Sequence, residues 1–201
     1  MKKSTYKIKA ATSSTSGYPH LLQRSNPPKH LLMRRRIIIA GFGGQGILFL
    51  GRFLAEIANE KGYNITWLPS YGPEMRGGTA NCCVIMSNRE IPSPVIDKAN
   101  ILICFNQPSF NKFYPETKKN ALVVIDSSLV KTNKKVVKID ATETAEKLGD
   151  KKVANMVIGR FVLRELGLYS KYISKKVLME IGLEKDMLKL NLKVLGIKLF
   201  L

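Results

Sequence analysis

The stretch IIIAGFGGQGILFLGRFLAE, residues 37–56, joins a short apolar run to a glycine-rich loop and then to a mostly apolar segment. The run at 37–40 is typical of a strand buried on both faces. Few polar side chains occur between residue 47 and Arg52, which predicts a largely buried helix over 47–61 that ends at Gly62. A strand that passes through a glycine loop into a helix indicates an α/β protein with parallel strands.

The rest of the chain repeats this alternation of apolar runs and helical patterns. Asp140 is expected to cap a helix, with Glu143 as its capping-box partner. A chain of 201 residues suffices for one domain with a full core. We therefore predict a three-layer α/β/α domain with a mostly parallel sheet over residues 33–201. Further strands are expected at 64–68, 80–86, 101–105, 122–125 and 136–139, and further helices at 153–166, 174–181 and about 185–199.

Loops that follow parallel strands share one edge of the sheet, where α/β proteins bind ligands. The loops concerned cover residues 41–46, 69–79, 106–110 and 126–130. The first, GFGGQG, matches G-x-G-x-x-G, and its glycines would let backbone N–H groups approach an anion. It lacks the Lys-Ser/Thr ending of a P-loop, and no acidic residue follows the second strand to bind a ribose. A stand-alone nucleotide-binding Rossmann-like protein is therefore the runner-up interpretation, and close packing of helix on strand is the purely structural one.

A second glycine-rich loop, SYGPEMRGGTANC, spans residues 70–82. Arg76 could pair with Glu74 or bind a carboxylate or phosphate through both guanidinium edges. The alternative is a solvated pair worth under about 1 kcal/mol. Both histidines, His20 and His30, precede the predicted domain. The loop is therefore expected to bind or to form an interface, not to perform acid–base chemistry.

The net charge of +18 is unevenly distributed, because residues 1–36 contain nine Lys and Arg residues and no acid. Residues 1–32 are rich in Ser, Thr, Pro and Lys without periodicity, which predicts a disordered basic extension. We interpret it as sequence that precedes a natural start at Met33; an acidic-surface binding segment and a transit-like leader are the alternatives. Neither nucleic acid nor a membrane is expected as a partner, because the sequence has no RNA-binding motif and no run of eighteen apolar residues.

The three cysteines, Cys82, Cys83 and Cys104, are too badly spaced for a disulfide framework, a zinc site or an iron–sulfur cluster. All three fall in predicted strands and are interpreted as small buried residues. Free thiols indicate a reducing cytoplasm.

Together, GFGGQGILFLGRFLAE, SYGPEMRGGTANC, IPSP at 91–94 and FNQP at 105–108 resemble the gamma subunit of 2-oxoacid:ferredoxin oxidoreductases. The motif SYGPEMRGGTANC is most similar to that of the 2-oxoglutarate and branched-chain 2-oxoacid enzymes of this family. The resemblance runs from about Ile37 to the C-terminus and implies the fold of the gamma domain of pyruvate:ferredoxin oxidoreductase.

This resemblance also implies an activity. Such enzymes convert a 2-oxoacid and coenzyme A to acyl-CoA and CO₂, with electrons passed to ferredoxin, and 2-oxoglutarate is the expected acid. The chain would act as an accessory subunit beside alpha and beta subunits, with or without a delta subunit. Thiamine diphosphate, Mg²⁺ and the iron–sulfur clusters would belong to those partners, and this chain alone would bind no cofactor.

The resemblance finally implies site residues that contact a phosphate of coenzyme A or a neighbouring subunit. Arg76 would be the anchor and Glu74 its orienting partner. No residue is expected to be catalytic or to bind a metal, because thiamine carries the carbanion chemistry. The expected site residues are Gly41, Gly43, Gly44, Gln45 and Gly46 of the first loop, Tyr71, Gly72, Glu74, Arg76, Gly77 and Gly78 of the second, and Asn106 and Gln107.

Overall fold

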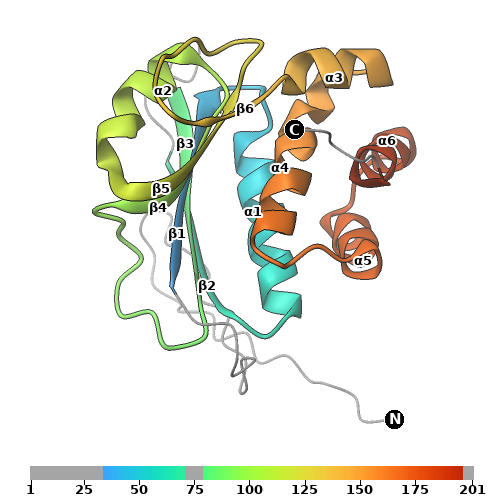
Figure 1. Ribbon diagram of the computed structural model, residues 1–201. Helices are drawn as coiled ribbons and strands as arrows, with labels where there is room; N and C mark the ends of the chain where they lie inside the picture. Colours follow the sequence, from blue (N-terminus) through green and yellow to red (C-terminus); the bar gives the residue numbers. More distant parts are fainter. Residues whose placement is uncertain (1–33, 71–78, 197–201) are drawn as a thin grey trace.

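The computed structural model describes residues 34–70 and 79–196 (Figure 1). The expected extension at 1–32 lies outside these residues, as does most of the second glycine-rich loop. The strands are β1 (Arg35–Phe42), β2 (Asn64–Ser70), β3 (Thr79–Ser87), β4 (Ala99–Cys104), β5 (Thr117–Asp126) and β6 (Val137–Ile139). The helices are α1 (Ile47–Glu60), α2 (Gln107–Phe113), α3 (Ala141–Leu148), α4 (Ala154–Glu165), α5 (Lys171–Ile181) and α6 (Lys185–Gly196), with 3₁₀ turns at Tyr114–Glu116 and Lys151–Val153.

The strands form one mixed sheet in the order β2-β3-β1-β4-β5-β6. β3 runs antiparallel to both β1 and β2, whereas β1, β4, β5 and β6 pair in parallel. α1 lies between β1 and β2 in the chain and lets these two strands run in the same direction, whereas β3 follows β2 after residues 71–78 and runs in the opposite direction. The prediction of a mostly parallel sheet is confirmed, and the carboxyl ends of β1, β2, β4, β5 and β6 share one edge.

Helices cover both faces of the sheet unequally (Figure 1). α1, α3 and α4 pack on one face, and α5 and α6 form an outer layer against α1 and α4. Only α2 and the loops beside it cover the other face in the described part of the chain. Each face of the sheet has its own hydrophobic core, and alternate residues of β1 contribute to the two cores. Ile37 and Ile39 are buried with α1 and α4, whereas Ile38 and Ala40 are buried with α2.

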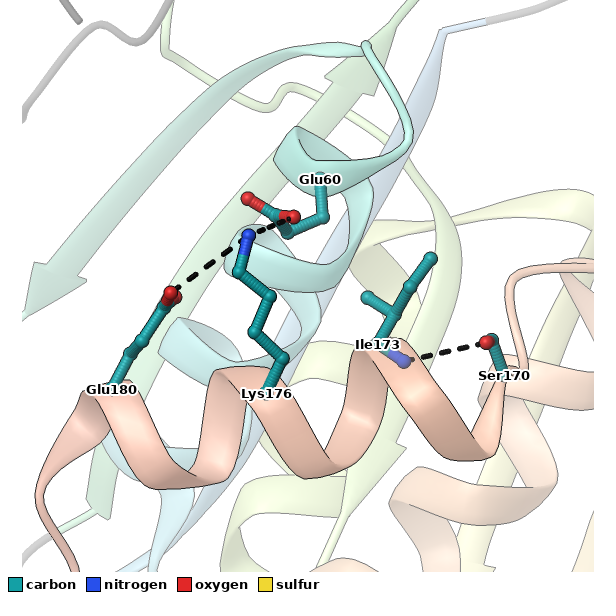
Figure 2. A network of polar contacts seen from close by, with 5 residues as sticks. All are labelled: Glu60, Ser170, Ile173, Lys176 and Glu180. Atoms are coloured by element: carbon teal, nitrogen blue, oxygen red, sulfur yellow. Dashed lines mark hydrogen bonds and ion pairs between the residues drawn. The ribbon is translucent and has the colours of Figure 1, made fainter. Parts of the chain in front are cut away.

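The outer helix α5 is fixed at its first turn and in its middle (Figure 2). Ser170 caps it, because its Oγ accepts a hydrogen bond of 3.3 Å from Ile173 N, so the helix begins earlier than predicted. Lys176 Nζ lies 2.6 Å from Glu60 Oε2 on α1 and 3.8 Å from Glu180 Oε1. This bridge adds a polar contact to the apolar packing of α5 on α1.

The predicted capping box of α3 is wrong. The Asp140 side chain makes no capping hydrogen bond. Asp126, at the end of β5, takes that role instead: its Oδ2 accepts hydrogen bonds from Thr142 N at 3.2 Å and Thr142 Oγ1 at 2.6 Å, and its Oδ1 accepts from Ser128 N at 3.1 Å. A fully buried carboxylate therefore joins the end of a strand to the start of a helix.

Among the described residues, every helix is too short or too polar to span a membrane.

Candidate functional site

The glycine loop lies at the carboxyl edge of the sheet, between β1 and α1. Gly44 and Gly46 have φ angles of +90° and +70°, which favour glycine. Gly46 is the N-cap of α1, whose first turn has no side-chain cap. No described residue accepts a hydrogen bond from the N–H groups of Gly43, Gly44 or Ile47, and Gly43 and Gly44 are exposed. The loop thus presents backbone donors at the positive end of a helix, as anion-binding loops do.

The side chain of Gln45 joins the ends of β1 and β4. Its Oε1 accepts a hydrogen bond of 2.7 Å from Phe42 N, and its Nε2 donates to Phe105 O at 3.1 Å. Asn106 Nδ2 lies 3.4 Å from the same Oε1. A Cβ at Gly41 would lie 2.6 Å from Gln45 Oε1 and from Ile47 Cδ1, so a larger residue there would displace both side chains. Gln45 therefore shapes the loop from within the fold.

Asn106 and Gln107 lie beside the glycine loop, at the start of α2. The Asn106 side chain is 3% exposed and caps α2 by accepting a hydrogen bond of 2.8 Å from Ser109 N. Gln107 accepts a hydrogen bond of 2.8 Å from Lys131 N, which fixes the loop after β5. Gln45 and Asn106 lie close together, as expected for residues at the same edge of the sheet. Both side-chain amides form hydrogen bonds within the protein.

Asn155 at the start of α4 holds the glycine loop from the opposite side, and sequence reasoning did not include it among the site residues. Its Nδ2 donates a hydrogen bond of 3.1 Å to Gly46 O, and its Oδ1 accepts one of 2.8 Å from Met156 N. A Cβ at Gly46 would lie 2.2 Å from this Nδ2. The sequence feature that could have indicated Asn155 is that it is the one polar side chain in the apolar string VANMVIG, residues 153–159.

The remaining expected residues, Tyr71, Gly72, Glu74, Arg76, Gly77 and Gly78, lie outside the described residues. The flanks of this segment are described. β2 ends at Ser70, and Thr79 at the start of β3 pairs with Phe42 in the β1–β3 ladder. Both glycine-rich motifs of the sequence therefore begin or end at the same corner of the sheet.

The three cysteines are free thiols that the fold buries wholly or in part. Burial raises the pKa of the Cys82 and Cys104 thiols to about 12. Burial, with a smaller contribution from the Glu116 charge, raises the pKa of Cys83 to about 11. These thiols are neutral at physiological pH and are therefore weak nucleophiles. Within residues 34–70 and 79–196, no three His, Cys, Asp or Glu side chains are grouped as metal ligands.

Two known proteins are similar to this chain in sequence. Ketoisovalerate oxidoreductase subunit VorA of Methanothermobacter marburgensis is 34% identical over 166 residues, which is 80% of this chain and 35% of VorA. 2-Oxoglutarate synthase subunit KorC of Methanocaldococcus jannaschii is 32% identical over 163 residues, which is 76% of this chain and 86% of KorC. The chain thus spans about a third of VorA but most of KorC.

Two solved structures have a fold similar to that of this chain. The gamma subunit of a keto/oxoacid ferredoxin oxidoreductase from Geobacter sulfurreducens matches with a TM-score of 0.70 at 26% identity, over 82% of this chain and 93% of that one. A 2-oxoglutarate:ferredoxin oxidoreductase from Magnetococcus marinus matches with a TM-score of 0.71 at 23% identity, over 81% of this chain and 30% of that one, and supports the fold alone. The family model described as pyruvate ferredoxin/flavodoxin oxidoreductase matches residues 36–196, and the chain belongs to this family.

Proposed function

We propose that this chain is the gamma subunit of a 2-oxoacid:ferredoxin oxidoreductase that converts a 2-oxoacid and coenzyme A to acyl-CoA and CO₂ and passes electrons to ferredoxin. The observation that carries the proposal is the match to relatives of subunit size, over 86% of KorC and 93% of the Geobacter gamma subunit. The match to KorC, a 2-oxoglutarate synthase subunit, is the reason to propose 2-oxoglutarate as the acid. The likeness to VorA makes a branched-chain 2-oxoacid the second candidate.

In this proposal the partners are alpha and beta subunits, with or without a delta subunit. Thiamine diphosphate and Mg²⁺ on alpha and beta would supply the decarboxylation chemistry, and iron–sulfur clusters on beta or delta would carry the electrons. The proposed location is the cytoplasm, where the free thiols of this chain stay reduced.

The role of this chain would be to bind and to position. The exposed N–H groups of Gly43 and Gly44 suit a phosphate of coenzyme A or a carbonyl or carboxylate of a neighbouring subunit. Gln45 and Asn155 would hold those donors in place through the hydrogen bonds to Phe105 and Gly46. The second glycine-rich loop would add Arg76 as an anchor and Glu74 as its partner, since one flank of that loop, Thr79, pairs with Phe42 of the first.

The overall proposal is tested by 2-oxoacid-dependent viologen reduction. The chain is assayed alone and co-expressed with the products of its neighbouring genes, with 2-oxoglutarate, 2-oxoisovalerate and pyruvate in parallel. We expect activity in the assembled complex, none in the isolated chain, and the highest kcat/KM with 2-oxoglutarate. A complex that is fully active without this chain would refute the assignment. Binding of a dinucleotide by the isolated chain would favour the Rossmann-like alternative.

Gly44→Ala tests the glycine loop separately, with Gly149→Ala as a matched control. Both glycines have positive φ, +90° and +122°, and a Cβ at either would meet nothing within 4 Å. Both variants therefore carry backbone strain without a collision, but only Gly44 lies in the candidate site. We expect G44A to raise KM for coenzyme A about tenfold, equivalent to about 1.4 kcal/mol, with KM for the 2-oxoacid unchanged. Loss of subunit association instead would favour the interface role, and equal behaviour of both variants would refute both roles.

A further inference from the structure

Two arginines lie together in the C-terminal half of α4 without an acidic partner. Arg160 is 2% exposed, and its Nη1 donates a hydrogen bond of 3.1 Å to Val194 O near the end of α6. Arg164 follows one turn later and is exposed. The two guanidinium groups lie 5.7 Å and 5.0 Å from the centroid of the same Tyr169 ring. We call Arg160, Arg164 and Tyr169 the arginine cluster.

The fold leaves part of the arginine cluster unsatisfied. Arg160 Nε is buried and has no hydrogen-bond partner. Since Nη1 is bonded to α6, the edge formed by Nε and Nη2 remains, and such an edge binds a carboxylate through two parallel hydrogen bonds. Burial, with a smaller contribution from the Arg164 charge, lowers the pKa of Arg160 below its ordinary value. A carboxylate at this edge would relieve the repulsion between the two arginines.

The described residues do not supply that carboxylate. None of the ion pairs among them includes Arg160 or Arg164. Glu165 is the one acid on α4, but it directly follows Arg164, and adjacent residues of a helix do not face each other. All other acids of the chain are described except Glu74, which belongs to the loop between β2 and β3. The flanks of that loop are at the carboxyl edge of the sheet, where α4 begins and not where it ends.

The helix that follows the arginine cluster presents apolar side chains to the outside. α5 starts two residues after Tyr169 and lies in the outer layer (Figure 1). Tyr172 is 80% exposed and Met179 is 58% exposed. They are seven residues apart, which places them on one side of the helix, away from its buried residues. Aromatic residues, Met and Arg are enriched at protein–protein interfaces, so this corner of the chain has the composition of an interface.

We propose that an acidic segment of another subunit docks on this corner, with a carboxylate on the arginine cluster and apolar side chains over Tyr172 and Met179. The proposal rests on the proposed function, because docking of this kind requires a multi-subunit enzyme. A second copy of the chain fits poorly, since two chains of net charge +18 repel each other. In VorA and the Magnetococcus enzyme, the part similar to this chain is 35% and 30% of a longer chain, so a further protein region is joined to it there.

The test compares assembly of the complex with stability of the isolated chain. R164E reverses the exposed charge of the arginine cluster, and Y172A removes the exposed ring. R89E is the matched control, because Arg89 is an exposed arginine on the loop after β3 and its reversal changes the net charge equally. Each full chain is co-expressed with the products of its neighbouring genes, and the Kd of the complex is measured from its dissociation on dilution. Urea unfolding of each isolated chain is followed in parallel.

We expect R164E to raise the Kd at least about thirtyfold, because an attractive charge contact at the interface becomes a repulsive one. Y172A should raise the Kd about tenfold, and R89E should leave it within about twofold. The urea midpoint of the isolated R164E chain should be unchanged or higher, because the lost contact with the Tyr169 ring is opposed by relief of the repulsion on Arg160. R164Q, expected to raise the Kd about tenfold, serves if R164E is not expressed.

Other outcomes overturn the proposal. Equal Kd values for R164E and R89E refute it, and a lowered urea midpoint in R164E would show that Arg164 serves the fold of its own chain. If millimolar inorganic phosphate raises the Tm of the isolated chain but not of R164E, and R164E assembles normally, the arginine cluster binds a small anion instead. A dimer of the isolated chain that R164E abolishes would assign the surface to a second copy. Failure of the unmodified chain to co-purify with any neighbouring gene product would refute the proposed function and this docking together, whereas the other outcomes leave the proposed function intact.

Discussion

Gly46→Ala tests the hydrogen-bonded contact between the glycine loop and α4. The new Cβ would impose two separate costs. An alanine at φ +70° is strained by about 1–2 kcal/mol. The same Cβ would lie 2.2 Å from Asn155 Nδ2, so the amide must move and give up its bonds to Gly46 O and Met156 N. That loss costs about 1–2 kcal/mol, since each bond contributes about 1 kcal/mol net. We expect G46A to lower the free energy of unfolding by about 2–4 kcal/mol.

The assay is urea unfolding of the full chain, followed by far-ultraviolet circular dichroism. N155A alone should cost about 1–2 kcal/mol, from the same lost bonds. The double variant G46A/N155A should cost about 2–4 kcal/mol, less than the sum of the single variants, because the displaced amide is already absent. G44A is the control, because it has the strain without the collision. Two results would contradict this reasoning. One is an equal loss of unfolding free energy in G46A and G44A. The other is a loss in G46A/N155A that equals the sum of the two single losses within about 0.5 kcal/mol. Either result would mean that Asn155 does not occupy the space beside Gly46.

Other predictions concern stability. D126A should lower the free energy of unfolding by about 2–4 kcal/mol, because it removes three hydrogen bonds to a buried carboxylate; D140A should stay within about 0.5 kcal/mol, and urea unfolding compares the two. K176M should cost at most about 1 kcal/mol despite its contact with α1, because the Lys176 side chain is 36% exposed. Burial raises the pKa of Cys82 and Cys104 from 9.0 to about 12, so the folded state keeps protons that the unfolded state loses. Stability from these thiols is therefore complete below about pH 9 and declines above it, by up to about 1.4 kcal/mol per pH unit for each thiol. Thermal unfolding at pH 8 to 11 should show this decline in the native chain and a smaller one in C82A/C104A.

Sequence patterns predicted the central strands well, because β1, β4 and β5 are buried on both faces and therefore read as continuous apolar runs. A continuous apolar run does not indicate whether a strand runs parallel or antiparallel to its neighbours. β3 is an apolar run too, with Val84 and Ile85 buried on opposite faces, and its insertion between β2 and β1 in the opposite direction was not predicted. Hydrophobicity indicates burial, whereas direction depends on how the chain connects one strand to the next.

The polar contacts were predicted less well, because their partners are far apart in the sequence. Asp140 fits the local pattern of a helix cap, yet the cap of α3 is Asp126, sixteen residues before Thr142. Asn155 is 109 residues from Gly46. The positions of the loops were predictable, since a parallel sheet places the ends of its strands at one edge. The amides that hold those loops were not, since a local motif does not contain them.

The glycine loop also shows why its motif alone overstates the case for a dinucleotide. The ends of β1 and β4 form the switch point of the sheet, because α1 and α2 leave them toward opposite faces, and dinucleotides bind at such points. Here the Gln45 side chain bridges the two strand ends, through Phe42 N and Phe105 O. A group that entered between the two strand ends would have to break these hydrogen bonds, at about 1 kcal/mol each. The donors of Gly43 and Gly44 remain exposed outside the bridge. A ligand or subunit that binds this loop, as the proposed function requires, would therefore approach the edge from outside.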